Sequence, residues 1–146
     1  MSELRWTAYN SPVTYLSSEL NSLGNNSNKV GSAIDFASTN RKMYMDVEIY
    51  LNTVDLSAQT NPAIHIWLLA RTDGSNFEDG SDSITPARAP DKIVPLREVN
   101  AAQRVFARFL LTTPDQGKIL IKNKTGTSLA SSGNTVKYRL YSQEIV

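Results

Sequence analysis

The feature that most constrains the fold is a period-two alternation of apolar and polar residues in short segments separated by turn residues. It is clearest from Lys42 to Asn52, where Met43, Met45, Val47, Ile49 and Leu51 alternate with Tyr44, Asp46, Glu48 and Tyr50. Because successive side chains of a strand point to opposite faces of its sheet, the first set predicts a core face and the second an outward face. Such segments are typical of an antiparallel sandwich or barrel.

Two further segments are apolar on both faces. From Ala63 to Arg71, the residues Ile64, Ile66, Leu68 and Ala70 alternate with His65, Trp67 and Leu69. From Val105 to Thr112, the residues Val105, Ala107, Phe109 and Leu111 alternate with Phe106, Arg108 and Leu110. A strand of this kind lies centrally or has its outer face covered, so we expect a cover over both.

Shorter strands are expected at Leu4–Tyr9, Lys29–Phe36, Lys92–Arg97, Lys118–Lys122 and Thr135–Ser142. Because Pro95 has no amide hydrogen, its strand is expected at a sheet edge or beside a bulge. Only Ser17–Leu23 is expected to be helical, with Ser17 as its cap and Gly24 as its end. The apolar residues at helical spacing there are Leu16, Leu20 and Leu23.

Eight strands in 146 residues predict one all-β sandwich domain that spans residues 1–146. Long polar connections such as Asp73–Pro90 favour an eight-stranded antiparallel jelly roll, with one short helix near the N-terminus, over an up-and-down barrel. An immunoglobulin-like sandwich is the alternative, although the Cys…Trp…Cys framework of antibody domains is missing.

Composition argues against several classes of function. With 15 basic and 14 acidic residues, the chain has a formal net charge of +1 and no basic cluster suited to nucleic acid. The absence of cysteine excludes disulfides and cysteine-ligated metals and mildly favours a cytosolic origin. The first residues lack a signal-peptide pattern, and the longest apolar run, Ile64–Ala70, is too short to span a bilayer. We expect no membrane insertion.

No catalytic constellation is evident, so we do not expect an enzyme or a cofactor. His65 is the only histidine, and it lies in mid-strand without a nucleophile motif, which favours a packed sheet histidine. Asp46 and Glu48 share a strand face, as a glycosidase pair would, but so do the carboxylates of any solvated strand.

The segment Asp73–Asp82 is dense in oxygen atoms that calcium prefers as ligands. Its spacing does not match an EF-hand. We therefore favour two turns, with Gly74 and Gly80 at positive-φ corners, and expect no metal.

Tyrosine-rich, mildly polar strand faces are typical of protein interfaces. A symmetric oligomer would also cover the extra apolar face at Trp67 and Leu69, and the segment Tyr141–Val146 could pair with a neighbour. The residues predicted to contact a partner are Trp67, Leu69, Tyr44, Tyr50, Tyr138 and Tyr141.

Short motifs in three parts of the chain form a recognisable set. They are Glu19–Leu23, then Leu68–Leu69 with Asp73–Gly80, and the C-terminal stretches Ile119–Gly126, Ala130–Arg139 and Tyr141–Val146. Together they resemble a family of small virion structural proteins of tailed bacteriophages. The resemblance extends from about Trp6 to the C-terminus and carries no catalytic signature. It implies a component of the particle and leaves its location open.

Small jelly-roll domains on phage particles commonly serve as capsid decoration, or cement, proteins, which sit as trimers over junctions between capsid subunits. The resemblance therefore implies a homotrimeric protein of the capsid surface, made in the host cytoplasm. It would bind the major capsid protein and stabilise the assembled head. One alternative is a tail, neck or fibre component. Another is a carbohydrate-binding jelly roll that contacts the host through Trp67 or Phe77 beside Asp73 and Asn76.

Overall fold

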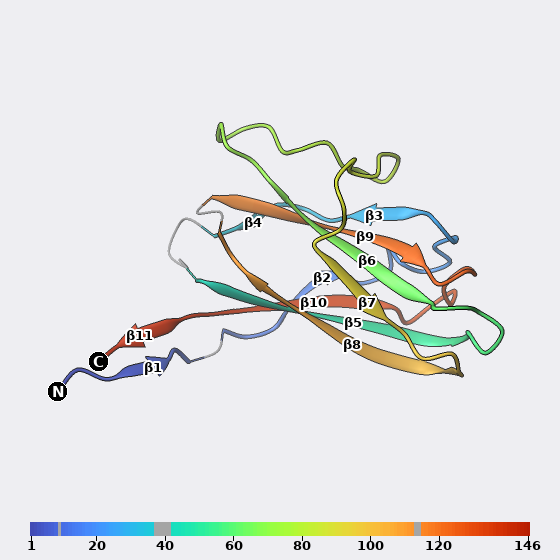
Figure 1. Ribbon diagram of the computed structural model, residues 1–146, viewed down its shortest axis with the longest axis horizontal. Coiled ribbons are helices and arrows are strands. Elements are labelled where there is room, and N and C mark those ends of the chain that lie inside the picture. Colours follow the sequence, from blue (N-terminus) through green and yellow to red (C-terminus); the bar gives the residue numbers. More distant parts are fainter. Residues whose placement is uncertain (9, 37–41, 113–114) are drawn as a thin grey trace.

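The alternating segments form antiparallel strands in a computed structural model that describes residues 1–8, 10–36, 42–112 and 115–146. The described residues hold eleven strands: β1 (Leu4–Trp6), β2 (Val13–Leu16), β3 (Asn28–Val30), β4 (Ile34–Asp35), β5 (Tyr44–Asp55), β6 (Ala63–Ala70), β7 (Lys92–Pro95), β8 (Asn100–Leu110), β9 (Gln116–Lys124), β10 (Thr135–Tyr141) and β11 (Gln143–Ile145). Two sheets lie one above the other (Figure 1). The four-stranded sheet has the order β2-β10-β5-β8, and the five-stranded sheet has the order β3-β9-β6-β7 with β4 also on β9.

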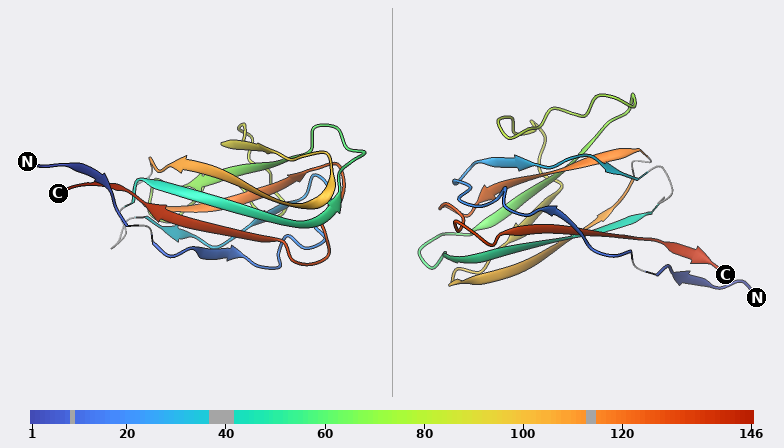
Figure 2. Two further views of the ribbon diagram at one scale, coloured as in Figure 1. Left: turned by 90° about the horizontal axis from the view of Figure 1, so that it is seen from below. Right: turned by 180° about the vertical axis from the view of Figure 1, so that it is seen from behind.

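The strands pair as one long antiparallel ribbon folded into two layers. β2 pairs with β10, β3 and β4 with β9, β5 with β8, and β6 with β7. The pairs β10–β5 and β9–β6 join these into sheets. Because β3 and β4 pair with successive parts of β9, they occupy one interrupted edge position. At the open end of the ribbon β1 pairs with β11, and this pair projects beyond the sandwich (Figure 2).

Two sequence predictions about the elements are wrong. The strands number eleven in the described residues rather than eight, because β2 and β11 were not expected and Lys29–Phe36 divides into β3 and β4. Leu4–Tyr9 forms only the short β1, and Tyr9 lies outside the described residues.

The second wrong prediction is the helix at Ser17–Leu23, where the chain makes successive turns instead. Ser22 has a positive φ of 58°, which an α-helix does not tolerate. Its amide donates to the carbonyl of Ala130 at 2.9 Å instead of to the preceding turn. Leu16, Leu20 and Leu23 are nevertheless buried. Their spacing therefore predicted the buried residues correctly but not a helix. No helix in the described residues is long and apolar enough to cross a membrane.

The main core lies between the two sheets. It contains the inward residues of β5 (Met45, Val47, Ile49 and Leu51) and, facing them, Ile64, Ile66, Ile119 and Ile121 from β6 and β9. These are among the most completely buried side chains, which confirms the core face predicted for β5. Met43 precedes β5 and is exposed, contrary to the prediction. The edge position predicted from Pro95 is confirmed, because β7 ends its sheet.

A second, smaller apolar cluster lies on the outer side of the five-stranded sheet. Trp67 and Leu69 of β6 and Leu120 of β9 are buried there, with Phe77 of the β6–β7 connection packed against them. This connection spans residues 71–91 and runs above the sheet as the green-to-olive trace in Figure 1. The cover expected over Trp67 and Leu69 is therefore supplied by the chain itself, so this face does not require an oligomer.

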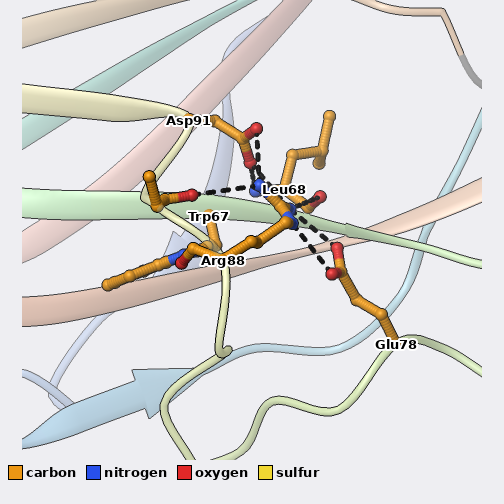
Figure 3. Close-up of polar contacts among 6 residues, drawn as sticks. Trp67, Leu68, Glu78, Arg88 and Asp91 are labelled. Atoms are coloured by element: carbon orange, nitrogen blue, oxygen red, sulfur yellow. Dashed lines mark hydrogen bonds and ion pairs between the residues drawn. The ribbon is translucent and has the colours of Figure 1, made fainter.

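Arg88 fixes the returning end of the connection to β6 (Figure 3). Its guanidinium contacts the carboxylates of Glu78 at 2.7 Å and Asp91 at 2.8 Å, and it donates to the carbonyl of Leu68 at 3.1 Å. The carboxylate of Asp91 accepts the Leu68 amide at 2.7 Å. Because β7 pairs with β6 only from Ala63 to Ile66, these side chains satisfy backbone groups that the ladder leaves open.

Candidate functional site

The outer face of the four-stranded sheet combines charged, aromatic and exposed apolar side chains. The register sets three side chains in each row across β10, β5 and β8: Tyr141–Tyr44–Leu110, Arg139–Asp46–Arg108, Lys137–Glu48–Phe106 and Thr135–Tyr50–Arg104. The β5 members of these rows are the outward set that the alternation predicts. We call this surface the outer face.

Ion pairs order the middle of the outer face. Arg108 of β8 binds the Asp46 carboxylate with two bonds, at 2.7 and 3.0 Å, and the Tyr141 hydroxyl donates to the same carboxylate at 2.9 Å. The hydrogen bond from Arg108 is the main cause that holds the pKa of Asp46 below its ordinary value. These bonds keep Asp46 ionised and bound to the sheet.

The neighbouring row carries a second ion pair. Arg104 lies 3.3 Å from the Glu48 carboxylate and covers the ring of Tyr50 at 5.1 Å. Across all rows, the cations Arg104, Arg108, Lys137 and Arg139 outnumber the carboxylates Asp46 and Glu48, so the formal side-chain charge of the outer face is +2. The face therefore favours an acidic partner.

A cavity of about 360 Å³ opens on this surface, and its lining includes Glu48, Arg104, Phe106, Lys137 and Arg139. The lining combines Pro12, Phe106 and Tyr138 with charged side chains of both signs. Binding sites for side chains or small molecules commonly have this mixture.

Two large apolar side chains of β8 are exposed on the outer face. Phe106 is 63% exposed and Leu110 is 59% exposed, although both belong to a segment with two apolar faces. β8 ends the order of its sheet. The cover that the sequence predicts for this strand is not supplied by the described residues, in contrast to β6. These two exposed apolar groups, with Arg108 between them on the strand, make the outer face a candidate contact surface.

The β1–β11 pair, which we call the arm, adjoins one end of the outer face. Leu4 pairs with Ile145 and Arg5 with Glu144, so apolar side chains share one side of the arm and an ion pair of 3.1 Å lies on the other. Trp6 joins the arm to the sheet, because its ring packs edge-on against Tyr44 at 5.5 Å and Tyr141 at 5.7 Å. Beyond Trp6, Leu4 is 66% exposed and Ile145 is 73% exposed.

The six predicted interface residues fall in three different places. Tyr44, Tyr50 and Tyr141 lie on the outer face, although Tyr141 is buried beneath Trp6. Tyr138 packs against the main core and the ring of Tyr15. Trp67 and Leu69 are buried under the β6–β7 connection. The segment expected to pair with a neighbour forms β11, which pairs with β1 of the same chain.

Sequence reasoning predicted a strand at Leu4–Tyr9 and a pairing segment at Tyr141–Val146, but it missed that these two pair as the arm, and it missed the exposed residues of β8. Phe106 and Leu110 could have been singled out, because they alternate with Arg104 and Arg108 on a segment whose second face is apolar. No local signal marks the pairing of the arm, since its two strands are short and lie at opposite ends of the sequence.

The candidate catalytic and metal-binding residues do not converge. His65 is half-buried on β6, and burial, followed by the charges of Lys124 and Lys122, lowers its pKa. Asp46 and Glu48 are each bound by an arginine. No group of three or more His, Asp or Glu side chains in the described ranges is arranged to hold a metal ion.

The Asp73–Asp82 segment forms a turn at its start. Asp73 accepts the amides of Ser75 at 2.8 Å and Asn76 at 2.7 Å, and these bonds lower the pKa of Asp73 to about 2. Gly74 has the predicted positive φ, 77°. Gly80 does not, so its prediction as a second positive-φ corner is wrong.

Trp67 and Phe77, the aromatic residues of the proposed carbohydrate-binding alternative, already make contacts within the same chain. The Trp67 indole is buried and donates to the carbonyl of Arg88 at 3.1 Å. The Phe77 ring lies 4.4 Å from the ammonium of Lys118 and 5.4 Å from the guanidinium of Arg71. The Trp67 ring therefore has no open face for a sugar to stack against, and the half-buried Phe77 ring already packs on the second cluster and contacts two cations.

No protein-family model matches the chain, and a search of curated proteins finds no match.

Proposed function

We propose that this protein is a non-catalytic structural component of a tailed-bacteriophage particle, and most specifically a decoration protein at the capsid surface. The proposal combines the resemblance of its short motifs with a fold that exposes apolar side chains on its outer face and arm. The exposed apolar groups of this face and arm, with no cover among the described residues, are the observation that carries it.

We further propose that the sandwich is a jelly roll, in which β3 and β4 together count as one strand. A jelly roll is a long antiparallel ribbon wound so that its first strand pairs with its last, its second with its seventh, and so on inward. The pairs β2–β10, β3/β4–β9, β5–β8 and β6–β7 follow this scheme. This agreement supports a jelly roll over an immunoglobulin-like sandwich.

The proposed mechanism is stabilisation by mass action. A protein that binds only the assembled shell lowers the free energy of that state and so opposes its disassembly. The outer face and the arm would contact the major capsid protein and neighbouring copies in a homotrimer. A tail, neck or fibre position would use the same surfaces. The carbohydrate-binding alternative has less support, because Trp67 is buried and the half-buried Phe77 ring contacts Lys118.

The test is the copy number of this chain in purified virions, measured by quantitative mass spectrometry against the major capsid protein. A ratio near one, or a simple fraction such as one third, is expected for a decoration layer. A trace ratio would instead assign the protein to the tail or neck. Its absence from virions would contradict the proposed function altogether.

A further inference from the structure

We propose that two side chains of the β6–β7 connection block the open edge of β6 from pairing with the same strand of a second copy. The two residues are Arg88 and Asp91, which bind the backbone of Leu68, and we call them the clamp. This inference goes beyond the proposed function and does not rest on it. It follows from the hydrogen bonds at the edge of β6, the composition of that strand and the way the clamp is held.

Part of one edge of β6 has no neighbouring strand. Of the described strands, β9 pairs with β6 from Ala63 to Ala70, whereas β7 pairs with the other edge only from Ala63 to Ile66. Alternate residues of an antiparallel strand direct both of their backbone groups to the same side. The N–H and C=O groups of Leu68 therefore lie on the β7 side of β6, beyond the end of β7.

The connection caps these backbone groups one by one. The Asp91 carboxylate accepts the Leu68 amide at 2.7 Å, and the Arg88 guanidinium donates to the Leu68 carbonyl at 3.1 Å. One position further along the same edge, the Glu78 amide donates to the Ala70 carbonyl at 2.9 Å. At Leu68, two side chains thus replace the acceptor and the donor that a neighbouring strand would supply.

The clamp is held in a defined orientation. Figure 3 shows the guanidinium of Arg88 between the carboxylates of Glu78 and Asp91. Glu78 binds it with two bonds, at 2.7 and 2.9 Å, and Asp91 binds it with two, at 2.8 and 3.0 Å. Because the guanidinium is planar and both carboxylates bind it through two bonds, its remaining donor points at one carbonyl.

The strand behind the clamp has the composition of segments that self-associate. Ala63–Ala70 contains no Asp, Glu, Lys, Arg, Pro or Gly, and most of its residues are large and apolar. Such segments pair with identical segments of other chains when they are exposed at a sheet edge. Charged residues and Pro commonly prevent this pairing, and β7 carries both, as Lys92 and Pro95. Since β6 has neither, its open edge depends on the clamp.

A second copy of β6 would satisfy the same backbone groups. When two antiparallel strands meet about a two-fold axis at Leu68, the two Leu68 residues lie opposite each other and exchange both N–H···O=C bonds. This pairing is self-complementary, as a two-fold interface between identical copies requires. The clamp occupies both groups of Leu68, so the native chain cannot pair in this way while the clamp is in place.

Sedimentation of the purified full chain tests the clamp. The uncapped variant Arg88→Ala/Asp91→Ala should self-associate with an apparent dissociation constant about tenfold or more below that of the native chain. Asp91→Asn keeps a side-chain oxygen that can accept the Leu68 amide, so it should associate less than Asp91→Ala. The control is Lys29→Gln, which removes the 2.9 Å ion pair between Lys29 and Asp82 of the same connection. Because β6 stays capped, this control should associate no more than the native chain.

Hydrogen exchange of the Leu68 amide locates the contact. In the uncapped variant at low concentration, this amide should exchange about tenfold faster than in the native chain, because it has lost its acceptor. It should regain protection as the concentration rises, because the carbonyl of the second copy then accepts it. The Ile119 amide, which donates to the Tyr15 hydroxyl at 3.0 Å, should stay protected throughout and so show that the sandwich remains folded.

If the double variant does not fold, Asp91→Ala alone gives the same test, since it uncaps the Leu68 amide. The inference is overturned if the folded uncapped variants associate no more than the native chain at millimolar concentration. It is also overturned if Lys29→Gln associates as strongly, or if association leaves the Leu68 amide unprotected. These measurements use purified protein, so their result is separate from the copy-number test of the proposed function.

Discussion

At Gly80 the β6–β7 connection approaches the sheet so closely that a β-carbon has no room. Such a carbon would lie 2.9 and 3.0 Å from the two methyl carbons of Leu69 and 3.3 Å from a methyl carbon of Leu120. Both leucines are fully buried, so neither can withdraw easily. Gly74 in the same connection is needed for a different reason. Its φ of 77° is a backbone conformation that other residues rarely adopt, whereas nothing lies within 4 Å of an added β-carbon there.

Gly80→Ala is therefore expected to lower the free energy of unfolding by about 1–3 kcal/mol through overpacking. In a Leu69→Val background the same substitution should cost less, because valine lacks the two δ-methyl carbons that the new methyl group would contact. Urea unfolding followed by circular dichroism measures both costs. Ser75→Ala, on an exposed site of the same connection, is the control and should stay within about 0.5 kcal/mol. An equal cost in both backgrounds would contradict a clash with Leu69.

Among the elements, β2 is tied to the opposite sheet through one side chain. The Tyr15 hydroxyl accepts the Ile119 amide of β9 at 3.0 Å and donates to the carbonyl of Ser32 at 2.8 Å. It thereby fills the gap between β3 and β4, where the edge strand is interrupted. Gly31 permits this, since a β-carbon there would overlap the Tyr15 ring. Burial is the main cause that raises the pKa of Tyr15 to about 12.

Tyr15→Phe should lower the free energy of unfolding by about 1–3 kcal/mol at neutral pH, because the Ile119 amide loses its partner. The folded pKa of about 12 lies above the ordinary value of 10.0, so stability from neutral Tyr15 is complete below pH 10.0 and is lost as the pH rises through about 12. Urea unfolding in that range should show the native chain losing up to about 3 kcal/mol more than Tyr15→Phe. Tyr50→Phe, on the outer face, should follow the native chain. Parallel pH profiles for native chain and Tyr15→Phe would refute the assignment.

The sequence predicts the long strands well because their alternation records burial on one side. The centres of β5, β6 and β8 follow from it, as do the second apolar face of β6 and the edge position of β7. Prediction from the sequence fails where hydrogen bonds between residues far apart in the chain determine the local structure. The leucines at 16, 20 and 23 imitate a helix, but the Ser22 amide finds its acceptor at Ala130.

The candidate site is predictable only in part, for the same reason. The outward residues of β5 follow from alternation, and the residues that flank them depend on a register the sequence does not specify. Tyr138 illustrates the difference, because it shares the inward phase of Val136 and Leu140 and packs on the core. A cover cannot be distinguished from a partner by sequence alone, which is why Trp67 and Leu69 were predicted to lie at an interface.

At the scale of the whole molecule, the two tryptophans differ in their surroundings. One lies in a buried cluster, and the other lies at the base of the exposed arm. Trp67 belongs to a second core that joins the β6–β7 connection to the five-stranded sheet, and its exposure is 3%. Trp6 holds only the base of the arm and is 56% exposed. The free energy of unfolding should therefore depend strongly on Trp67 and weakly on Trp6.

Trp67→Ala is expected to lower the free energy of unfolding by about 3–5 kcal/mol, because a large buried side chain is replaced by a cavity. Trp6→Ala should cost only about 1 kcal/mol, the value of its edge-on contacts with Tyr44 and Tyr141. Urea unfolding measures both. Hydrogen exchange adds a local test, since the Glu78 amide, which donates to the Ala70 carbonyl at 2.9 Å, should lose protection in Trp67→Ala but not in Trp6→Ala. A cost near 1 kcal/mol for Trp67→Ala would mean that the connection opens without disturbing the sandwich. The buried cluster would then be a surface that the connection uncovers for a partner rather than a second core.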